Sequence, residues 1–288
     1  MPRIHPHPEV LTGRIQLLPG DQGRLQRHIR ECSSCRRKLE EREPAARREG
    51  NVLSWRPPET AAGRAVDGVL GSFRSRVQAV ARERAEAPAL LAELLGHPVR
   101  RQEILARNSR RFRTLALCGL LLQRSHEVSV DDPAQGEQLA SLALRLAGLL
   151  DEGWYGERVL ADTRGRCWSL IGNARRIAED LPGAEEALLQ AEDDLDRGTG
   201  DLTEKAQLLV YKAFLRQAQH RLDEAAVLFR RTVSIFLSAG EPLQAAESIV
   251  ELAHVEQDRG EPERAIQILA RANTLIGLAV EPAPRASP

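Results

Sequence analysis

The sequence predicts an all-α protein, and three observations carry that prediction. Ala, Leu, Arg and Glu dominate the 288 residues and aromatic residues make up only 3%, a bias typical of helices. No segment alternates apolar and polar residues with the period of two that a strand requires. Small and large apolar residues also recur about every 40 residues in the C-terminal half, as in stacked helical hairpins. We therefore expect a small N-terminal helical module followed by a helical-hairpin solenoid.

Two short helices are expected at the N-terminus. The first covers residues 9–18, whose apolar side chains fall on one side. Pro19-Gly20 ends it, and Asp21 can cap a second helix that runs toward the first two cysteines. Helices this short bury little apolar surface, so we expect another interaction to hold them together.

That interaction is predicted to be a metal ion. His28, Cys32 and Cys35 lie on one face of the second helix, because each helical residue turns by about 100°. Structural zinc takes four thiolate or imidazole ligands, and His5 and His7 are both candidates for the fourth. A redox Cys-x2-Cys pair would need a strand–turn–helix context that is missing here, and a chance spacing is the remaining alternative. We expect one structural zinc ion per chain.

The His-x3-Cys-x2-Cys spacing resembles the zinc-binding anti-sigma factors of bacteria over about residues 4–40. The resemblance implies zinc ligation by His28, Cys32, Cys35 and His5, which precedes Leu11 at the spacing of the family's histidine. It also implies that a zinc-stabilised module, residues 1–40, binds an extracytoplasmic-function sigma factor.

A linker and a connecting region are expected next. Residues 41–62 are rich in charge, proline and glycine, with little apolar periodicity, which predicts a flexible linker. Residues 63–113 are predicted to be a helical connecting region. Its first helix would insert between sigma-factor domains, as the resemblance implies, or pack on the following helices. Its apolar stripe, at spacings of three and four, is Val66, Val69, Leu70, Phe73, Val77 and Val80.

Residues 114–278 contain the repeats, and residues 279–288 are predicted to be a disordered tail. Ala184, Ala225 and Ala265 occupy one column, where a small residue lets two helices approach closely. Four further columns agree with it: Leu188, Phe229 and Leu269; Ala191, Thr232 and Ala272; Gly172, Ala213 and Ala253; Trp168, Leu209 and Ile249.

These columns resemble the tetratricopeptide repeat, and Ala140, Leu144 and Ala147 indicate a degenerate unit upstream. An irregular helical bundle is the alternative. The resemblance implies a concave surface that binds a peptide or protein. Arginines beside amide and apolar groups would suit an extended peptide or a carboxylate. The residues expected to line this surface are Arg166, Asn173, Arg176, Gln207, Phe214, Gln217, His254 and Gln257.

Several other classes of function are not expected. No glycine-rich phosphate loop or catalytic motif is present, and His126, His220 and His254 are isolated, so we do not expect an enzyme. The 41 basic and 41 acidic residues balance, which argues against nucleic acid as a partner. A basic cluster remains as the less favoured alternative for nucleic-acid binding: Arg100, Arg101, Arg107, Arg110, Arg111 and Arg113.

The expected location is the cytoplasm. The sequence shows no apolar leader segment, and its best uncharged run, residues 114–123, is too short to span a membrane. Cys118 and Cys167 lie within apolar helical patterns, as expected for thiols in a reducing compartment. We therefore predict a zinc-binding regulatory or adaptor protein, anti-sigma-like, whose repeats bind a second protein. The alternative is a pure interaction scaffold that contacts no sigma factor.

Overall fold

A computed structural model describes Cys32 and residues 61–280, with side chains described for Cys32 and residues 68–273. Within these residues every regular element is a helix and no strand occurs, so the all-α prediction is confirmed for the described part of the chain. The chain divides into two compact units, Met1–Gly68 and Val69–Pro288. Nearly all of the predicted module, linker and tail lies outside the described residues.

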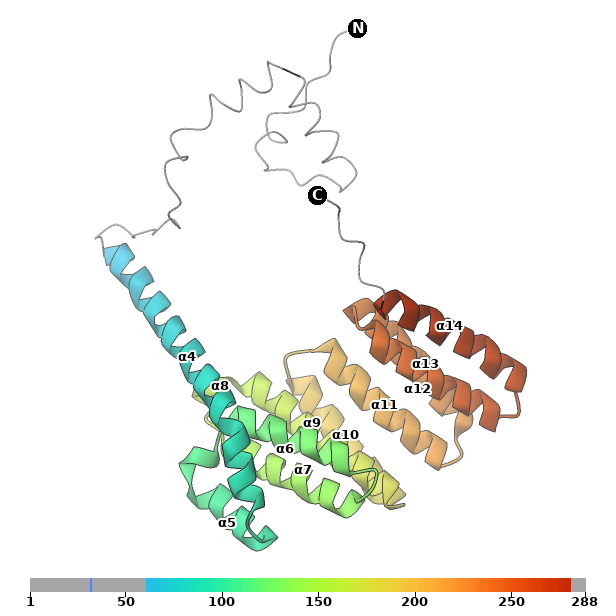
Figure 1. The fold of residues 1–288 in the computed structure, drawn as a ribbon, viewed down its shortest axis with the longest axis horizontal. Helices are drawn as coiled ribbons and strands as arrows, with labels where there is room; N and C mark the ends of the chain where they lie inside the picture. The colour runs from blue at the N-terminus through green and yellow to red at the C-terminus, as the bar shows by residue number, and fades with distance from the viewer. Residues whose placement is uncertain (1–31, 33–60, 281–288) are drawn as a thin grey trace. The chain divides into compact units, whose positions relative to one another are not determined.

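The described helices follow one another through short connections (Figure 1). In chain order they are α4 (Ala61–Leu95), α5 (Val99–Asn108), the 3-10 turn η1 (Arg110–Phe112), α6 (Leu115–Val128), α7 (Pro133–Ala147), α8 (Glu152–Tyr155), α9 (Glu157–Ile177), α10 (Leu181–Arg197), α11 (Leu202–Ala218), α12 (Leu222–Ala239), α13 (Pro242–Asp258) and α14 (Pro262–Val280).

Local sequence signals determine where several helices begin and end. Thr114, Asp132, Asp180 and Asp201 each accept hydrogen bonds from backbone N–H groups in the first turn of α6, α7, α10 and α11. These donors have no partner within the helix, so a side-chain oxygen at this position stabilises the helix start. Gly240 ends α12 in a left-handed conformation, with φ 79°, that glycine adopts without strain.

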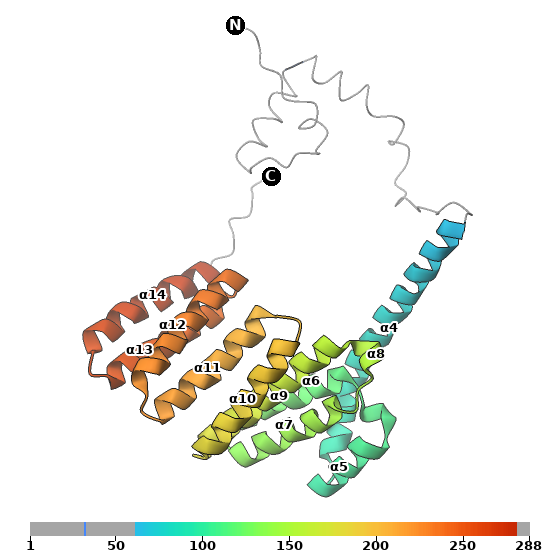
Figure 2. The same ribbon diagram turned by 180° about the vertical axis from the view of Figure 1, so that it is seen from behind.

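From α6 onward the long helices pack mainly on their neighbours in the chain, as Figures 1 and 2 show. Contacts join α6 to α7, α7 to α9, α9 to α10, and so on to α13 and α14. α9 also contacts both α6 and α11. α6, α9 and α11, which alternate along the chain with α7, α10 and α12, therefore lie side by side.

Glycine permits a close contact between α9 and α10. A Cβ atom added at Gly172 would lie 2.8 Å from Cγ of Leu188 and 3.2 Å from the carbonyl oxygen of Ala184. Gly165, two turns earlier, is similarly close to Leu195. Gly172, Ala184 and Leu188 belong to three of the repeat columns, so these columns mark a real helix–helix contact.

Most other column residues are also buried. Ala184, Ala225 and Ala265 are buried, as are Ala191, Thr232 and Ala272. Leu269 on α14 is an exception, with 42% of its surface exposed. Among the described residues no helix follows α14 to cover it. The same column therefore packs in the inner helices and lies open in the last one.

A buried carboxylate joins the last three helices. Glu256 on α13 is fully buried and lies 2.6 Å from Arg230 on α12 and 3.0 Å from Arg259 after α13. Arg264 on α14 lies 4.0 Å from it. A buried charge is tolerated only when it is paired in this way, so the cluster holds α12, α13 and α14 together.

Candidate functional site: a groove with oppositely charged walls

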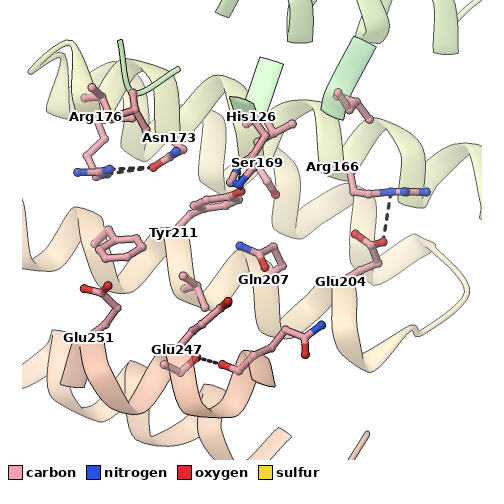
Figure 3. A pocket seen from close by; sticks show the side chains of 18 of the residues that line it. His126, Arg166, Ser169, Asn173, Arg176, Glu204, Gln207, Tyr211, Glu247 and Glu251 are labelled. Carbon is pink, nitrogen blue, oxygen red and sulfur yellow. Dashed lines mark hydrogen bonds and ion pairs between the residues drawn. The ribbon is translucent and has the colours of Figure 1, made fainter. Parts of the chain in front are cut away.

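A groove of about 670 Å³ lies on the surface formed by α6, α9, α11 and α13. Figure 3 shows α9 and α13 on opposite sides of it, with α11 between them. The residues that line it are Leu122, Gln123, His126, Val130, Arg166, Ser169, Leu170, Asn173, Arg176, Ile177, Glu204, Gln207, Val210, Tyr211, Phe214, Phe236, Gln244, Glu247, Ser248 and Glu251.

Two arginines on α9 give one wall its positive charge, and their surroundings differ. Arg166 Nε lies 3.3 Å from Glu204 Oε1 on α11, so its charge is compensated. Arg176 instead donates from Nε and a terminal nitrogen to Oδ1 of Asn173, at 3.1 and 3.0 Å. Its guanidinium also lies over the ring of Phe214, 5.2 Å from the centroid. Arg176 is thus held in place by a neutral amide and an aromatic face.

Arg176 differs from Arg166 in that its positive charge is not paired with a carboxylate of another described residue. It is half-buried, and burial lowers its pKa from the ordinary value. Among the described residues no carboxylate lies within ion-pair distance of it. A guanidinium has five N–H donors, and Asn173 takes only two of them. The remaining donors are available to an acceptor on a bound ligand.

The opposite wall, on α13, is negative. Glu247 and Glu251 both line the groove, one turn apart on the same face of the helix. Glu251 is half-buried and lies 3.4 Å from Nδ1 of His254, while Glu247 is exposed. The groove is therefore positive along α9 and negative along α13. A ligand that carries both signs of charge would fit it in one orientation.

Tyr211 and His126 form part of the floor. The Tyr211 hydroxyl lies 3.4 Å from Nδ1 of His126 on α6. Burial raises the pKa of Tyr211 to about 12, so the phenol stays protonated at neutral pH. Burial also raises the pKa of Glu204 above its usual range, while nearby Arg166 acts in the opposite direction.

The structure brings together five of the eight residues predicted to line the surface. Arg166, Asn173, Arg176, Gln207 and Phe214 all line the groove. Their side chains come from α9 and α11, whose faces had the periodicity on which the prediction rested. Whether these residues bind a partner stays a prediction.

The other three predicted residues do not line the groove. Gln217 donates to Oδ2 of Asp258 at 2.8 Å, His254 lies beside Glu251, and Gln257 is exposed farther along α13. The part of α13 that lines the groove is earlier, at Gln244, Glu247, Ser248 and Glu251. The repeat columns align residues along the chain, but the packing of the helices decides which turns lie level with one another.

The groove side chains that sequence reasoning missed include His126, Tyr211, Gln244 and Glu251. Gln244, Glu247 and Glu251 are spaced three and four residues apart, so they share one polar face of α13. That face was a signal available in the sequence. His126 had no such signal, because its neighbour Tyr211 is 85 residues away.

The predicted zinc ion is contradicted by the described residues. No group of three or more His, Cys, Asp or Glu side chains among them is arranged to hold a metal. Of the expected ligands, Cys32 is buried, while His5, His28 and Cys35 lie outside the described part of the chain. Helical spacing brings side chains to one face of a helix. It does not bring a fourth ligand to them, which a closed zinc site also requires.

The basic cluster considered for nucleic acid is partly engaged within the protein. Arg111 forms an ion pair with Glu93 and lies over the ring of Phe112, and Arg113 donates to the backbone carbonyl of Arg107.

No helix within residues 61–280 is both long enough and apolar enough to cross a membrane.

Fold and groove together define an all-helical protein whose side-by-side helices carry a cavity with oppositely charged walls. Comparisons with protein-family models and with curated proteins found no match. Among solved structures, the chain is similar to one titled "Crystal structure of BtubC (BKLC) from P. vanneervenii". That similarity covers 80% of this chain and 97% of the other, at 17% identity and a TM-score of 0.47. A similarity of this extent carries no argument about function.

Proposed function

We propose that this protein is a regulatory adaptor whose groove holds an extended segment of a partner protein. In this proposal α6 to α14 form a tetratricopeptide-like helical-hairpin solenoid. The observation that carries it is Arg176, a half-buried cation stacked on Phe214 with no carboxylate partner among the described residues. Such a charge is costly unless a ligand anion compensates it.

The groove offers more than one contact to an extended peptide. An acidic side chain or a C-terminal carboxylate would pair with Arg176. A basic side chain farther along would face Glu247 and Glu251. The side-chain amides of Gln207 and Gln244 can donate to and accept from the backbone of the peptide. Binding, and not catalysis, is the function that we propose for this arrangement.

The N-terminal part of the proposal concerns the sigma factor. There, residues 1–40 would bind an extracytoplasmic-function sigma factor while the groove holds a second protein. A pure scaffold, which uses the groove and contacts no sigma factor, is the alternative. Co-purification of the full chain from its native host separates the two, because only the regulator brings a sigma factor with it.

The groove is tested with labelled peptides and the full-length protein. The peptides carry one acidic and one basic residue at varied separation, with a free or an amidated C-terminus, and binding is followed by fluorescence anisotropy. We expect Arg176→Gln to weaken binding about tenfold, since a charge-assisted hydrogen bond contributes about 1.5 kcal/mol. Glu247→Gln should weaken binding of these peptides, but not of a matched peptide in which glutamine replaces the basic residue. Loss of affinity on amidation would identify a C-terminal carboxylate as the anion.

Arg158→Gln is the matched control, because Arg158 is exposed and does not line the groove. It should bind every peptide as the unmodified chain does. Unchanged affinity of Arg176→Gln, with its helical circular dichroism intact, would contradict the proposed site.

A further inference from the structure

α4 carries an apolar surface that the groove proposal does not use. Val69, Leu70, Phe73 and Val77, which we call the open seam, have between 41% and 67% of their surface exposed. None of them lines the groove. Four large apolar side chains exposed side by side are expected at an interaction site, whereas isolated ones need no explanation.

The open seam is one half of a longer coiled-coil pattern. Leu70, Phe73, Val77 and Val80 alternate spacings of three and four, and after Arg84 the same pattern continues at Ala87, Leu91 and Leu94. In this second half Ala87 and Leu94 are buried, and Leu91 packs against the main core. The spacing is that of a seam facing another helix. One half of the seam is thus covered by the protein itself, and the other half is uncovered.

The contacts of α4 leave the open seam accessible. Arg76 donates to the carbonyl oxygen of Trp154 at 2.5 Å and lies over its ring, 5.0 Å from the centroid. Two turns later, Glu83 accepts a hydrogen bond from the Tyr155 hydroxyl at 2.9 Å. These contacts join α4 to α8 at the edge of the seam. Figures 1 and 2 show that, within the second unit, the part of α4 before these contacts stands away from the other helices.

The charge beside the open seam indicates what kind of helix would cover it. Residues 69–82 contain three arginines and no acidic residue. Arg74 and Arg76 flank the seam on its two sides, both are exposed, and neither forms an ion pair with another described residue. A second copy of α4 would bring these positive charges against each other. A helix with acidic flanks would pair with them instead.

We propose that the open seam docks an amphipathic helix of a partner protein, apolar at heptad spacing and acidic along its flanks. The partner helix would continue the seam where the protein's own helices stop covering it. Its apolar side chains would pack around Phe73 and Val77, and its carboxylates would lie beside Arg74 and Arg76.

The test uses the full-length protein and two labelled synthetic helices of about three heptads. Both have leucine along the seam. One has glutamate at the flanking positions and the other has lysine. We expect the acidic helix to bind at least tenfold more tightly, as read by fluorescence anisotropy. Phe73→Glu should reduce its affinity at least tenfold. The double variant Arg74→Glu/Arg76→Glu should weaken the acidic helix and strengthen the basic one.

Two control variants match the chemistry of the substitutions. Val227→Glu changes an exposed apolar residue on α12, and Arg158→Glu reverses an exposed charge on α9. Both should bind the acidic helix normally. Arg176→Gln should also bind it normally, which separates this site from the groove.

Three results would overturn the proposal. The acidic helix could fail to bind, or bind without regard to Phe73 and the two arginines. Sedimentation could show a dimer that Phe73→Glu dissociates, which would make a second copy the occupant. Finally, the helix could bind only after residues 1–60 are removed, which would show that the chain covers the seam itself.

Discussion

At the scale of residues, paired charges join successive helices. Glu185 on α10 accepts hydrogen bonds from two nitrogens of Arg216 on α11, at 2.5 and 2.7 Å. Gln219 adds a third, at 3.1 Å. The hydrogen bonds from Arg216 lower the pKa of Glu185 to about 2. Bidentate pairs of this kind are the stronger ion pairs of protein surfaces.

This pair predicts a pH-dependent contribution to stability. Because the folded-state pKa of Glu185 is depressed, its stabilisation is present above the unfolded-state pKa of about 4.3 and is lost as the pH falls toward about 2. The carboxylate is about one-third exposed, so solvent screening limits the effect and Glu185→Gln should cost about 1 kcal/mol at pH 7. Urea unfolding at several pH values measures the difference, which should shrink below pH ~4.5.

Glu86→Gln is the control for this prediction. Glu86 is exposed and forms no ion pair with the other described residues, so its removal should change stability little at any pH. A cost of Glu185→Gln that stays constant down to pH ~3 would contradict the linkage argument.

At the scale of elements, the contact of α9 with α10 depends on the absence of a side chain at Gly172. Glycine weakens a helix by about 1 kcal/mol relative to alanine. Here its use is explained by the packing of Leu188 and Ala184 against that position. α6 contains the opposite case, since a Cβ atom at Gly119 would meet no atom within 4 Å.

The two glycines predict opposite effects of one substitution. Gly172→Ala should destabilise the fold by about 1–3 kcal/mol, because Leu188 and the backbone of α10 must move. Gly119→Ala should stabilise it by about 0.5–1 kcal/mol through helix propensity alone. Urea or thermal unfolding of both variants checks the pair. Stabilisation by Gly172→Ala would show that α9 and α10 are not packed this closely.

At the scale of the whole molecule, the compact unit Val69–Pro288 contains the groove and the main core. A chain that starts at Val69 should therefore be strongly helical and unfold cooperatively. Its midpoint temperature should lie within about 3 °C of that of the full chain, which corresponds to about 1 kcal/mol at this size. Circular dichroism with heating measures both. A much lower midpoint, or a broad transition, would mean that residues 1–68 contribute to the core.

The sequence alone predicted features that depend on neighbours within one element. The columns around Gly172 and Ala184 predicted where helices meet, because the period of 3.6 residues places these side chains on one face. The faces of α9 and α11 supplied Arg176 and Phe214 for the same reason.

Only the tertiary structure decided what those faces meet. Tyr211 reaches His126, and Glu251 lies across the groove from Arg176, because of how α6, α9, α11 and α13 are offset along their axes. Apolar residues at the same spacing lie on both sides of Arg84 in α4, yet Leu94 is buried and Phe73 is exposed. Spacing along the chain determines the face of a helix. Which part of that face is covered depends on where the other helices end.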